Sequence, residues 1–197
     1  MKKILFIGNS YTYYNDMPMS IFAPLAQSDG ETVLVTSVTR GGARLVQHAD
    51  PDTELGQKLR SAIRGQRFDW VILQEQSLAP IAAPDTFRNG VSLLKAMLEP
   101  HTEHFLLYAT WGRKPGAQFL TESGLTTEEM TRLLAEAYDK MGAEHGMPVA
   151  HVGKAFLRYR QEHPDAEVYH EDGTHPSPLG SRIAAETLWN AIQAAEV

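Results

Sequence analysis

The chain has 197 residues, of which 43% are hydrophobic and 21% charged, so it is long enough to bury a substantial core. Its formal net charge of -6 and its scattered Lys and Arg residues exclude the basic surface that non-specific nucleic-acid binding requires. Because it contains no cysteine, it has no disulfide, no thiol nucleophile and no cysteine-ligated metal.

Neither a membrane span nor an export signal is indicated. No stretch approaches the roughly 20 apolar residues of a membrane span. The apolar run 4–7 is shorter than the roughly 7 to 15 residues of a signal-peptide core. We therefore expect a cytoplasmic protein, unless a leader was removed, and a single domain over residues 1–197.

Taken along the chain, short apolar runs that end in glycine or polar residues predict five buried strands. These strands are residues 4–7, 32–38, 68–73, 105–109 and 147–152. Apolar periodicity and capping residues predict helices between and after them. One helix is expected over residues 19–26, and another begins at residues 155–159. The other four have inward-facing residues within 55–63 (capped by Asp52), 87–98 (capped by Asp85), 130–141 (begun by a capping box of Thr126 and Glu129) and 183–192 (capped by Ser177, with Pro178 at the first position). We expect residues 11–20 and 112–124 to be loops.

The alternation of strands and helices predicts an α/β protein. The expected fold is a flavodoxin-like three-layer α/β/α sandwich around a five-stranded parallel sheet in the order 2-1-3-4-5. In such a sheet ligands bind beyond the carboxyl ends of the strands, beside the first strand. We therefore expect a crevice lined by Ser10, Gly41, Gly42, residues 74–77 and Trp111.

Two patterns near this crevice allow nucleophilic catalysis. Ser10 follows a buried strand, a position where a serine is more often a helix cap or a turn residue. Asp172 and His175 are three residues apart in a glycine-bearing loop, so the carboxylate can orient the imidazole while the far ring nitrogen accepts a serine proton. Such a pair alone is usually solvated surface. The three residues predict a serine hydrolase if the fold brings them together.

Four blocks of the chain together resemble the SGNH hydrolases, the GDSL-like esterase family. GNSYT, GGARL, LQEQS and DGTHP stand, in this order, where the family has its G-D-S serine block, its glycine, its G-x-N-D block and its D-x-x-H motif. The resemblance spans nearly the whole chain, with Asn9 as a departure from the Asp of G-D-S. It implies that Ser10 is the nucleophile, that His175 is the general base and then acid, and that Asp172 orients His175.

The resemblance also implies three donors for an oxyanion. These are the backbone N–H of Ser10, that of Gly42 (or Gly41), and a side-chain amide. Here the chain departs from the family pattern, because Gln74 and Gln76 stand where the family has Asn. Glutamine carries the same donor on a longer stem, so it suits a backbone placed further back. We expect Gln74, at the strand tip, to be this donor, although alignment with G-x-N-D selects Gln76.

The activity that the resemblance implies is hydrolysis of small acyl esters, such as O-acetyl groups on a carbohydrate, without a cofactor. Thioesters and lipid esters are variants of this substrate class. Two alternatives are a flavodoxin-like cofactor-binding module and a non-catalytic carbohydrate-binding relative of the esterase fold. Against the first, GNSYTYYND has one glycine, and no helix is predicted directly after it.

Residues after other strand ends are candidates for the substrate pocket. Trp111 is either a cover of the core or a platform that stacks on a sugar. Arg40, Arg44 and Arg113 are either solvated or anion-binding. We expect no metal, because residues 170–175 would supply every ligand from one loop.

Overall fold

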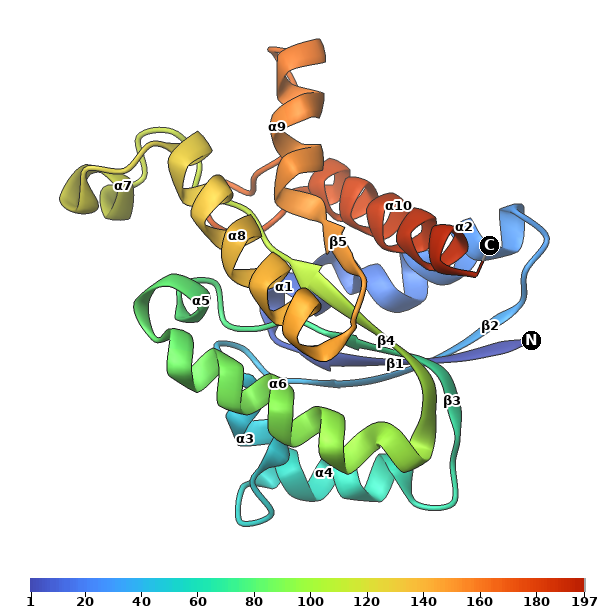
Figure 1. The fold of residues 1–197 in the computed structure, drawn as a ribbon. Helices are drawn as coiled ribbons and strands as arrows, with labels where there is room; N and C mark the ends of the chain where they lie inside the picture. The colour runs from blue at the N-terminus through green and yellow to red at the C-terminus, as the bar shows by residue number, and fades with distance from the viewer. Residues whose placement is uncertain (197) are drawn as a thin grey trace.

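The structure, a computed structural model of the chain, describes residues 1–196 and contains a parallel sheet in the order β2-β1-β3-β4-β5 (Figure 1). The strands are β1 (Lys2–Gly8), β2 (Val33–Thr39), β3 (Phe68–Leu73), β4 (Thr102–Ala109) and β5 (Val149–His151). Each neighbouring pair runs parallel, so all carboxyl ends lie at one edge. The predicted fold class and strand order are confirmed.

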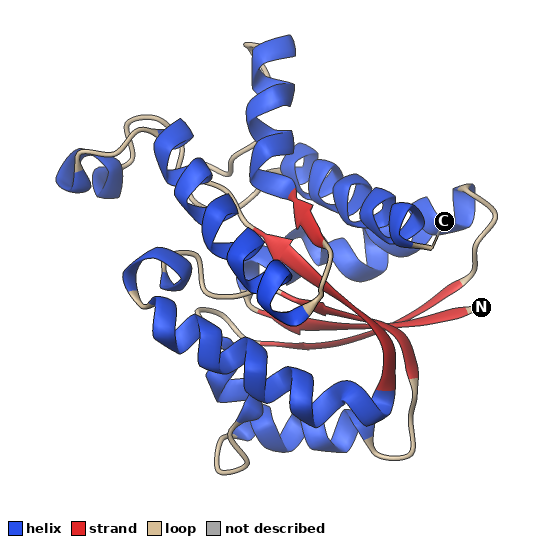
Figure 2. Cartoon of the chain, in the orientation of Figure 1, coloured by secondary structure: helices blue, strands red, loops and turns tan. Residues whose placement is uncertain are grey.

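Helices cover both faces of the sheet (Figure 2). One face carries α2 (Ala23–Ser28), α9 (Val152–Glu162) and α10 (Pro178–Ala195), and the other carries α3 (Leu45–Ala49), α4 (Glu54–Ile63), α6 (Pro84–Leu98) and α8 (Thr127–His145). Shorter elements are α1 (Ser10–Tyr13), α5 (Ala79–Ala82), α7 (Gln118–Ser123), the 3-10 turns Tyr14–Asp16 and Glu99–His101, and the π-helical turn Met17–Phe22. None of the helices within residues 1–196 is both long and apolar enough to cross a membrane.

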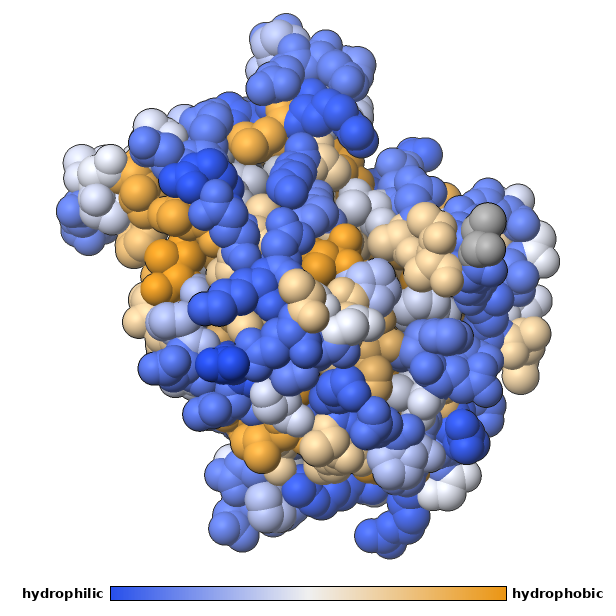
Figure 3. Space-filling view, in the orientation of Figure 1, coloured by the Kyte–Doolittle hydropathy of each residue, from blue (hydrophilic) through white to orange (hydrophobic). Residues whose placement is uncertain are grey.

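The central strand β1 shows why its sequence is a continuous apolar run. Ile4 and Phe6 pack toward the layer of α10, whereas Leu5 and Ile7 pack toward the layer of α3 and α6. All four side chains are fully buried, and burying each one contributes about 1.5–3 kcal/mol. The outer surface seen in Figure 3 is largely hydrophilic, with apolar side chains in small separate groups. The core therefore lies on both sides of the sheet.

Two predicted helix starts are confirmed in detail. At α8, Thr126 Oγ1 accepts a hydrogen bond from the Glu129 N–H (3.1 Å), and a Glu129 carboxylate oxygen accepts one from the Thr126 N–H (2.8 Å). At α10, Ser177 Oγ accepts from the Gly180 N–H (3.0 Å). Each bond satisfies an N–H group that lacks a partner inside its helix.

Two other predicted caps are wrong by one or two residues. Thr53, not Asp52, caps α4, because its Oγ1 accepts from the Gly56 N–H (3.0 Å). Asp52 instead belongs to the preceding turn. Helix α6 begins at Pro84, before Asp85, because the fixed φ of proline suits the first helical position. Asp85 then lies in the first turn, where a negative charge is favourable.

Both predicted loops contain helical segments. Residues 11–20 lie in α1, the 3-10 turn and the π-helical turn, and residues 112–124 contain α7, which projects from the body beside α8 (Figure 1). The short helices α3 and α5 were not predicted either. Helices of four to six residues are too short to show an apolar repeat in the sequence. Whether they form depends on their packing against the rest of the protein.

Candidate active site

Ser10 stands at the carboxyl end of β1, as the first residue of α1. The turn into the helix is fixed by Asn9, whose Oδ1 accepts from the Tyr11 N–H (3.1 Å). The Asn9 Nδ2 donates to the carbonyl oxygen of Ala43 (3.0 Å), in the loop after β2. An aspartate has no donor for this second bond. Asn9 therefore ties the serine turn to the neighbouring loop.

The loop before α10 holds Asp172 and His175 in one fixed arrangement. Its ends pair antiparallel at Tyr169 and Pro176. Within it, Asp172 Oδ1 accepts from the backbone N–H groups of Thr174 and His175, both at 2.9 Å. The other carboxylate oxygen, Oδ2, lies 2.6 Å from His175 Nδ1. This short bond places the ring proton on Nδ1 and leaves Nε2 as an acceptor.

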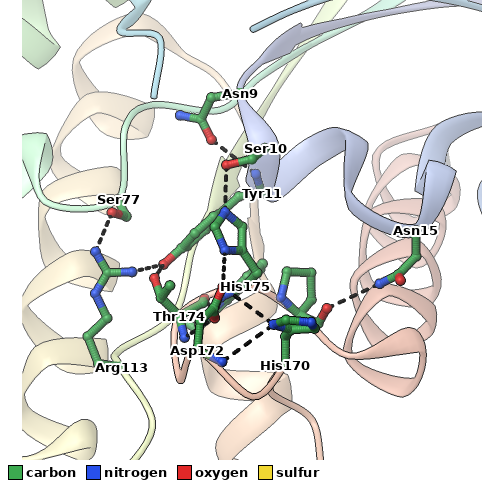
Figure 4. Close-up of polar contacts among 12 residues, drawn as sticks. Asn9, Ser10, Tyr11, Asn15, Ser77, Arg113, His170, Asp172, Thr174 and His175 are labelled. Atoms are coloured by element: carbon green, nitrogen blue, oxygen red, sulfur yellow. Dashed lines mark hydrogen bonds and ion pairs between the residues drawn. The ribbon is translucent and has the colours of Figure 1, made fainter. Parts of the chain in front are cut away.

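The far nitrogen of His175 meets the serine. Its Nε2 lies 2.8 Å from Ser10 Oγ, so a hydroxyl, an imidazole and the Asp172 carboxylate stand in series (Figure 4). Aromatic rings hold the imidazole on two sides. Tyr14 stacks on it with centroids 4.5 Å apart and an interplanar angle of 16°, and Tyr11 meets it edge-on at 5.6 Å. The three residues named from sequence therefore come together.

Asp172 is held in its charged form. Partial burial acts to raise its pKa, but hydrogen bonds from the His175 ring and from the backbone N–H groups of His175 and Thr174 outweigh this and lower the pKa to about 2. The ring of His170 also approaches Asp172, with 3.4 Å between Nδ1 and Oδ2. Within residues 1–196 no three His, Asp or Glu side chains are grouped as metal ligands.

A hollow of about 250 Å³ opens over the serine. Residues from several strand ends line it, among them Ser10, Gly42, Gln76, Ser77, Arg113 and His175. Another hollow of about 310 Å³ lies at the opposite end of the sheet, around Trp70 and His104. Among the described residues that line that hollow, no hydroxyl is hydrogen-bonded to an imidazole. The chemistry of the side chains, and not the volume, identifies the site.

Two backbone N–H groups at this hollow are suitable oxyanion donors. Ser10 occupies the first position of α1, where the N–H has no partner inside the helix. Gly42 has a φ of +68°, a left-handed backbone conformation that residues with a side chain rarely adopt. Its N–H donates no hydrogen bond within residues 1–196. Gly41 does not line the hollow.

Gln74 does not reach the hollow. Its side chain is fully buried, with Oε1 accepting from the Asn9 N–H (3.0 Å) and from the Thr12 hydroxyl (2.8 Å). Its Nε2 donates to the backbone carbonyl of Glu75. A Cβ on Gly8 would lie 2.6 Å from Gln74 Oε1, so a glycine is needed there. The expectation that Gln74 donates to an oxyanion does not fit these contacts, because its amide is already engaged beneath the site.

Gln76 is the glutamine at the hollow. Its Oε1 accepts from the backbone N–H groups of Leu78 (2.9 Å) and Ala79 (3.0 Å), and this fixes the plane of the amide. The opposite end, Nε2, has only a long contact of 3.4 Å with Ser77 Oγ. Gln76 therefore carries an oriented donor with free hydrogen-bonding capacity at the hollow. It is the glutamine that alignment with G-x-N-D selects.

Trp111 belongs to the core rather than to the pocket. It is fully buried, with Tyr11 stacked on one side and Phe156 on the other, both at centroid distances of 4.5 Å. Its Nε1 donates to the Thr174 carbonyl oxygen (3.0 Å). The interpretation as a core cover is thus the one that fits. Trp111 thus supports Tyr11, which lines the hollow, by stacking, and it supports the loop that carries His175 through its hydrogen bond to Thr174.

The arginine at the hollow is Arg113, not Arg40. Arg40 and Arg44 are exposed and do not line it, because the loop after β2 turns their side chains outward. Arg113 is half-buried and donates to the hydroxyls of Tyr11 and Ser77. The sequence predicts Ser77 as a crevice residue without a specific role. Its position directly after Gln76 was the only available signal.

Glu75 is expected among the residues that line the crevice, but it is fully buried and does not line the hollow. Its carboxylate accepts hydrogen bonds from the N–H of Leu45, the first residue of α3, and from the N–H of Gln76. Burial raises its pKa to about 7, although these hydrogen bonds act in the opposite direction. An acidic residue two positions after a buried strand is a signal of such a perturbed carboxyl group.

A parallel α/β sheet with a hydroxyl, an imidazole and a carboxylate in series at its carboxyl edge is an arrangement found in serine hydrolases. A protein from Slackia heliotrinireducens, provisionally assigned to the SGNH hydrolases, is 32% identical, with 97% of this chain and 98% of that chain covered and a TM-score of 0.82. The chain therefore belongs to the SGNH hydrolase family, as the resemblance predicted, and this family consists of hydrolases.

More distant structures share the fold. A DUF4886 family protein from Bacteroides uniformis is 17% identical over 98% of this chain and 83% of its own, with a TM-score of 0.81. An acetylxylan esterase from Geobacillus stearothermophilus is 16% identical over 97% of this chain and 94% of its own, with a TM-score of 0.67. No protein-family model matches the chain, and no curated protein matches it in sequence.

Family membership also bears on the flavodoxin-like alternative. The expectation that no helix follows the first strand directly is wrong, because α1 begins at Ser10 itself. The comparison with an SGNH hydrolase along nearly the whole chain nevertheless favours a hydrolase.

Proposed function

We propose that the protein is a serine esterase in which Ser10 attacks the carbonyl carbon of a small acyl ester. The observation that carries this proposal is the pair of hydrogen bonds on His175, at 2.8 Å to Ser10 Oγ and 2.6 Å to Asp172 Oδ2. A serine hydroxyl is a weak nucleophile at neutral pH unless a base takes its proton. The Nε2 of His175 is a base within reach, and Asp172 holds the ring in the required tautomer.

The first half-reaction forms an acyl-enzyme. His175 Nε2 takes the hydroxyl proton of Ser10 as Oγ bonds to the ester carbon, and the carbonyl oxygen becomes an oxyanion. The N–H groups of Ser10 and Gly42 and the Nε2 of Gln76 donate to it. The intermediate collapses, the bond to the alcohol breaks, and the imidazolium returns the proton to the departing alkoxide.

The second half-reaction repeats this chemistry with water. His175 takes a proton from a water molecule, whose oxygen bonds to the acyl carbon. The same three donors hold the new oxyanion. When it collapses, the bond to Ser10 Oγ breaks, the imidazolium reprotonates the serine, and the carboxylic acid leaves. Asp172 stays ionised throughout, because its pKa of about 2 lies far below neutral pH.

The substrate we propose is a small acyl ester, with an O-acetyl group on a carbohydrate as the leading candidate. The hollow of about 250 Å³ suits a short acyl chain, and polar side chains such as Gln76 and Ser77 border it. A neighbour in fold is named an acetylxylan esterase, which supports this substrate class.

The test is labelling with a fluorophosphonate, followed by peptide mapping, together with hydrolysis of 4-nitrophenyl acetate. We expect modification at Ser10 and its loss in His175→Ala. Ser61→Ala, on the exposed face of α4, is the matched control and should be labelled as the wild type is. Absence of labelling in a folded wild-type protein that binds an acetylated sugar would instead support the non-catalytic carbohydrate-binding alternative.

A further inference from the structure

Arg113 is the charged side chain at the hollow that the proposed reaction leaves without a role. It follows β4 and reaches the wall of the hollow that also contains Ser10 and His175 (Figure 4). Acyl transfer as described needs a nucleophile, a base and oxyanion donors, and other residues supply these. A guanidinium in an ester-binding hollow therefore requires its own explanation.

The guanidinium is held in one orientation by neutral groups. Its Nη2 donates to Ser77 Oγ (2.9 Å), its Nη1 donates to the Tyr11 hydroxyl, and its Cζ lies 5.8 Å from the centroid of the Tyr11 ring. The backbone is fixed as well, because its carbonyl oxygen accepts from Thr127 Oγ1 (2.7 Å). This cation is preorganised, unlike a mobile surface arginine.

No carboxylate of residues 1–196 neutralises this arginine. Other arginines form ion pairs on the surface, namely Arg88 with Glu144, Arg132 with Glu136 and Arg182 with Glu186. Arg113 instead has two hydroxyl partners and is half-buried. A partly desolvated charge without a counter-ion favours binding of an anion.

The remaining hydrogen-bonding capacity suits such an anion. A guanidinium carries five N–H donors in a planar fork, and the hydroxyls of Tyr11 and Ser77 occupy two of them. The free donors can bind a carboxylate, including in a bidentate manner. Arg113 and Ser10 border the same hollow of about 250 Å³, so a molecule with its ester carbonyl at Ser10 has room for an acidic group a few bonds away.

We infer that Arg113 forms an anion subsite and that the natural substrate is an ester with a carboxylate close to the scissile carbonyl. This inference rests on the proposed esterase function and narrows its substrate class. The carboxylate belongs either to the acyl half, as in a half-ester of a dicarboxylic acid, or to the alcohol half, as in an acylated hydroxy acid or uronic acid. Both halves present the same chemistry to the guanidinium.

The experiment compares matched neutral and anionic esters. For the acyl half, the pair is the butyrate and the monosuccinate ester of 4-methylumbelliferone. For the alcohol half, it is O-acetyl-lactate and its methyl amide. We expect the wild type to favour the anionic member of one pair by about 10- to 100-fold in kcat/KM, as is typical of hydrogen bonds to a charged group. The pair that shows the preference identifies the half that carries the charge.

Variants assign the preference to Arg113. In Arg113→Met the ratio of anionic to neutral kcat/KM should fall to about 1, and Arg113→Lys should retain part of it, because it keeps the charge without the planar fork. Arg132→Met removes an exposed arginine of α8 and should leave both rates unchanged.

The outcomes separate this inference from the proposed function. Equal rates for neutral and anionic esters in the wild type, or a preference that survives in Arg113→Met, would overturn the anion subsite and leave the esterase intact. If the wild type hydrolyses none of the four esters and a fluorophosphonate does not label Ser10, both proposals fail together. If Arg113→Met does not fold, Arg113→Lys assigns the preference, and equal wild-type rates overturn the inference without any variant.

Discussion

Two layers of polar side chains lie at the carboxyl edge of the sheet, and they differ in how their hydrogen bonds are used. The lower layer contains Asn9, Gln74 and Glu75, which are exposed by 2% or less. Its donors and acceptors bind one another and the surrounding backbone. The upper layer contains Ser10, Gln76 and His175, which border the hollow. Within residues 1–196, Gln76 Nε2 has only a long contact, and the Nε2 of His175 is bound only to the Ser10 hydroxyl.

Neighbours in sequence fall into different layers. Asn9 and Ser10 are adjacent, as are Glu75 and Gln76. Asn9 and Glu75 are buried and bound to the surrounding scaffold, with Asn9 forming the floor of the hollow, whereas Ser10 and Gln76 border the hollow. A step of one residue at a strand end turns the side chain toward a different side. The comparison predicts that changes in the upper layer reduce turnover, whereas changes in the lower layer reduce stability.

The largest effect is expected at Ser10. Ser10→Ala removes the nucleophile, so kcat for a 4-nitrophenyl ester should fall by about 10⁴- to 10⁶-fold. Its urea unfolding curve should match that of the wild type, because Ser10 Oγ contributes little to the core. A variant that retained more than a tenth of wild-type turnover would show that the serine is not the nucleophile. It would also contradict the assignment of catalysis to the upper layer.

The two glutamines test the division most directly. Gln76→Ala should lower kcat by about 100- to 1000-fold, as expected for loss of one oxyanion donor, with little change in unfolding free energy. Gln74→Ala leaves the Asn9 N–H and the Thr12 hydroxyl without an acceptor, so it should lower the unfolding free energy by about 1–3 kcal/mol for each unsatisfied group. Steady-state kinetics and urea titration measure both. The opposite pattern would return the oxyanion role to Gln74.

The two glutamines also show which part of the site could not be predicted from the sequence. Strand order was predictable, because apolar runs alternate with helical periodicity along the chain. Ser10, Asp172 and His175 were predictable only from the four blocks together, because a serine after a strand or a D-x-x-H pair alone is more often structural. The choice between Gln74 and Gln76 depends on the direction of a side chain after the last strand residue, and no periodicity records that direction. The same missing information left Trp111 and Arg40 as candidates for the substrate pocket, and the structure places Trp111 in the core and Arg40 outside the hollow. Arg113 was a candidate, but its partners Tyr11 and Ser77 lie 102 and 36 positions away in the chain, so no local pattern links them.

Glu75 makes the lower layer sensitive to pH. Burial raises its pKa from 4.5 to about 7, so the folded protein keeps a proton that the unfolded chain has released. This group therefore stabilises the fold below pH 4.5 relative to pH 7, and its contribution to the unfolding free energy falls by about 3 kcal/mol as the pH rises between these values. Glu75→Gln removes this titration and can retain an acceptor for the Leu45 N–H.

His48 acts in the opposite direction over nearly the same range. Its ring is fully buried, and burial lowers its pKa from 6.5 to about 4, so its contribution is present above pH 6.5 and is lost as the pH falls toward 4. The two titrations should nearly cancel in the wild type. In Glu75→Gln, the unfolding free energy should rise by about 3 kcal/mol between pH 4.5 and 6.5, as measured by urea unfolding at several pH values. A variant whose curve ran parallel to that of the wild type would contradict the raised pKa of Glu75.

The smallest effect is expected at Tyr14, which lies beside the upper layer without taking part in bond formation. Its ring stacks on His175 at 4.5 Å, so it is a positioning residue that limits rotation of the imidazole. Tyr14→Leu should lower kcat by about 2- to 10-fold with KM nearly unchanged, and Tyr14→Phe should restore the rate because it keeps the aromatic face. Tyr13→Leu, at an exposed neighbouring tyrosine, is the control for loss of a ring in this segment. Equal losses of kcat in Tyr14→Phe and Tyr14→Leu would assign the effect to the Tyr14 hydroxyl. They would show that ring stacking does not position His175.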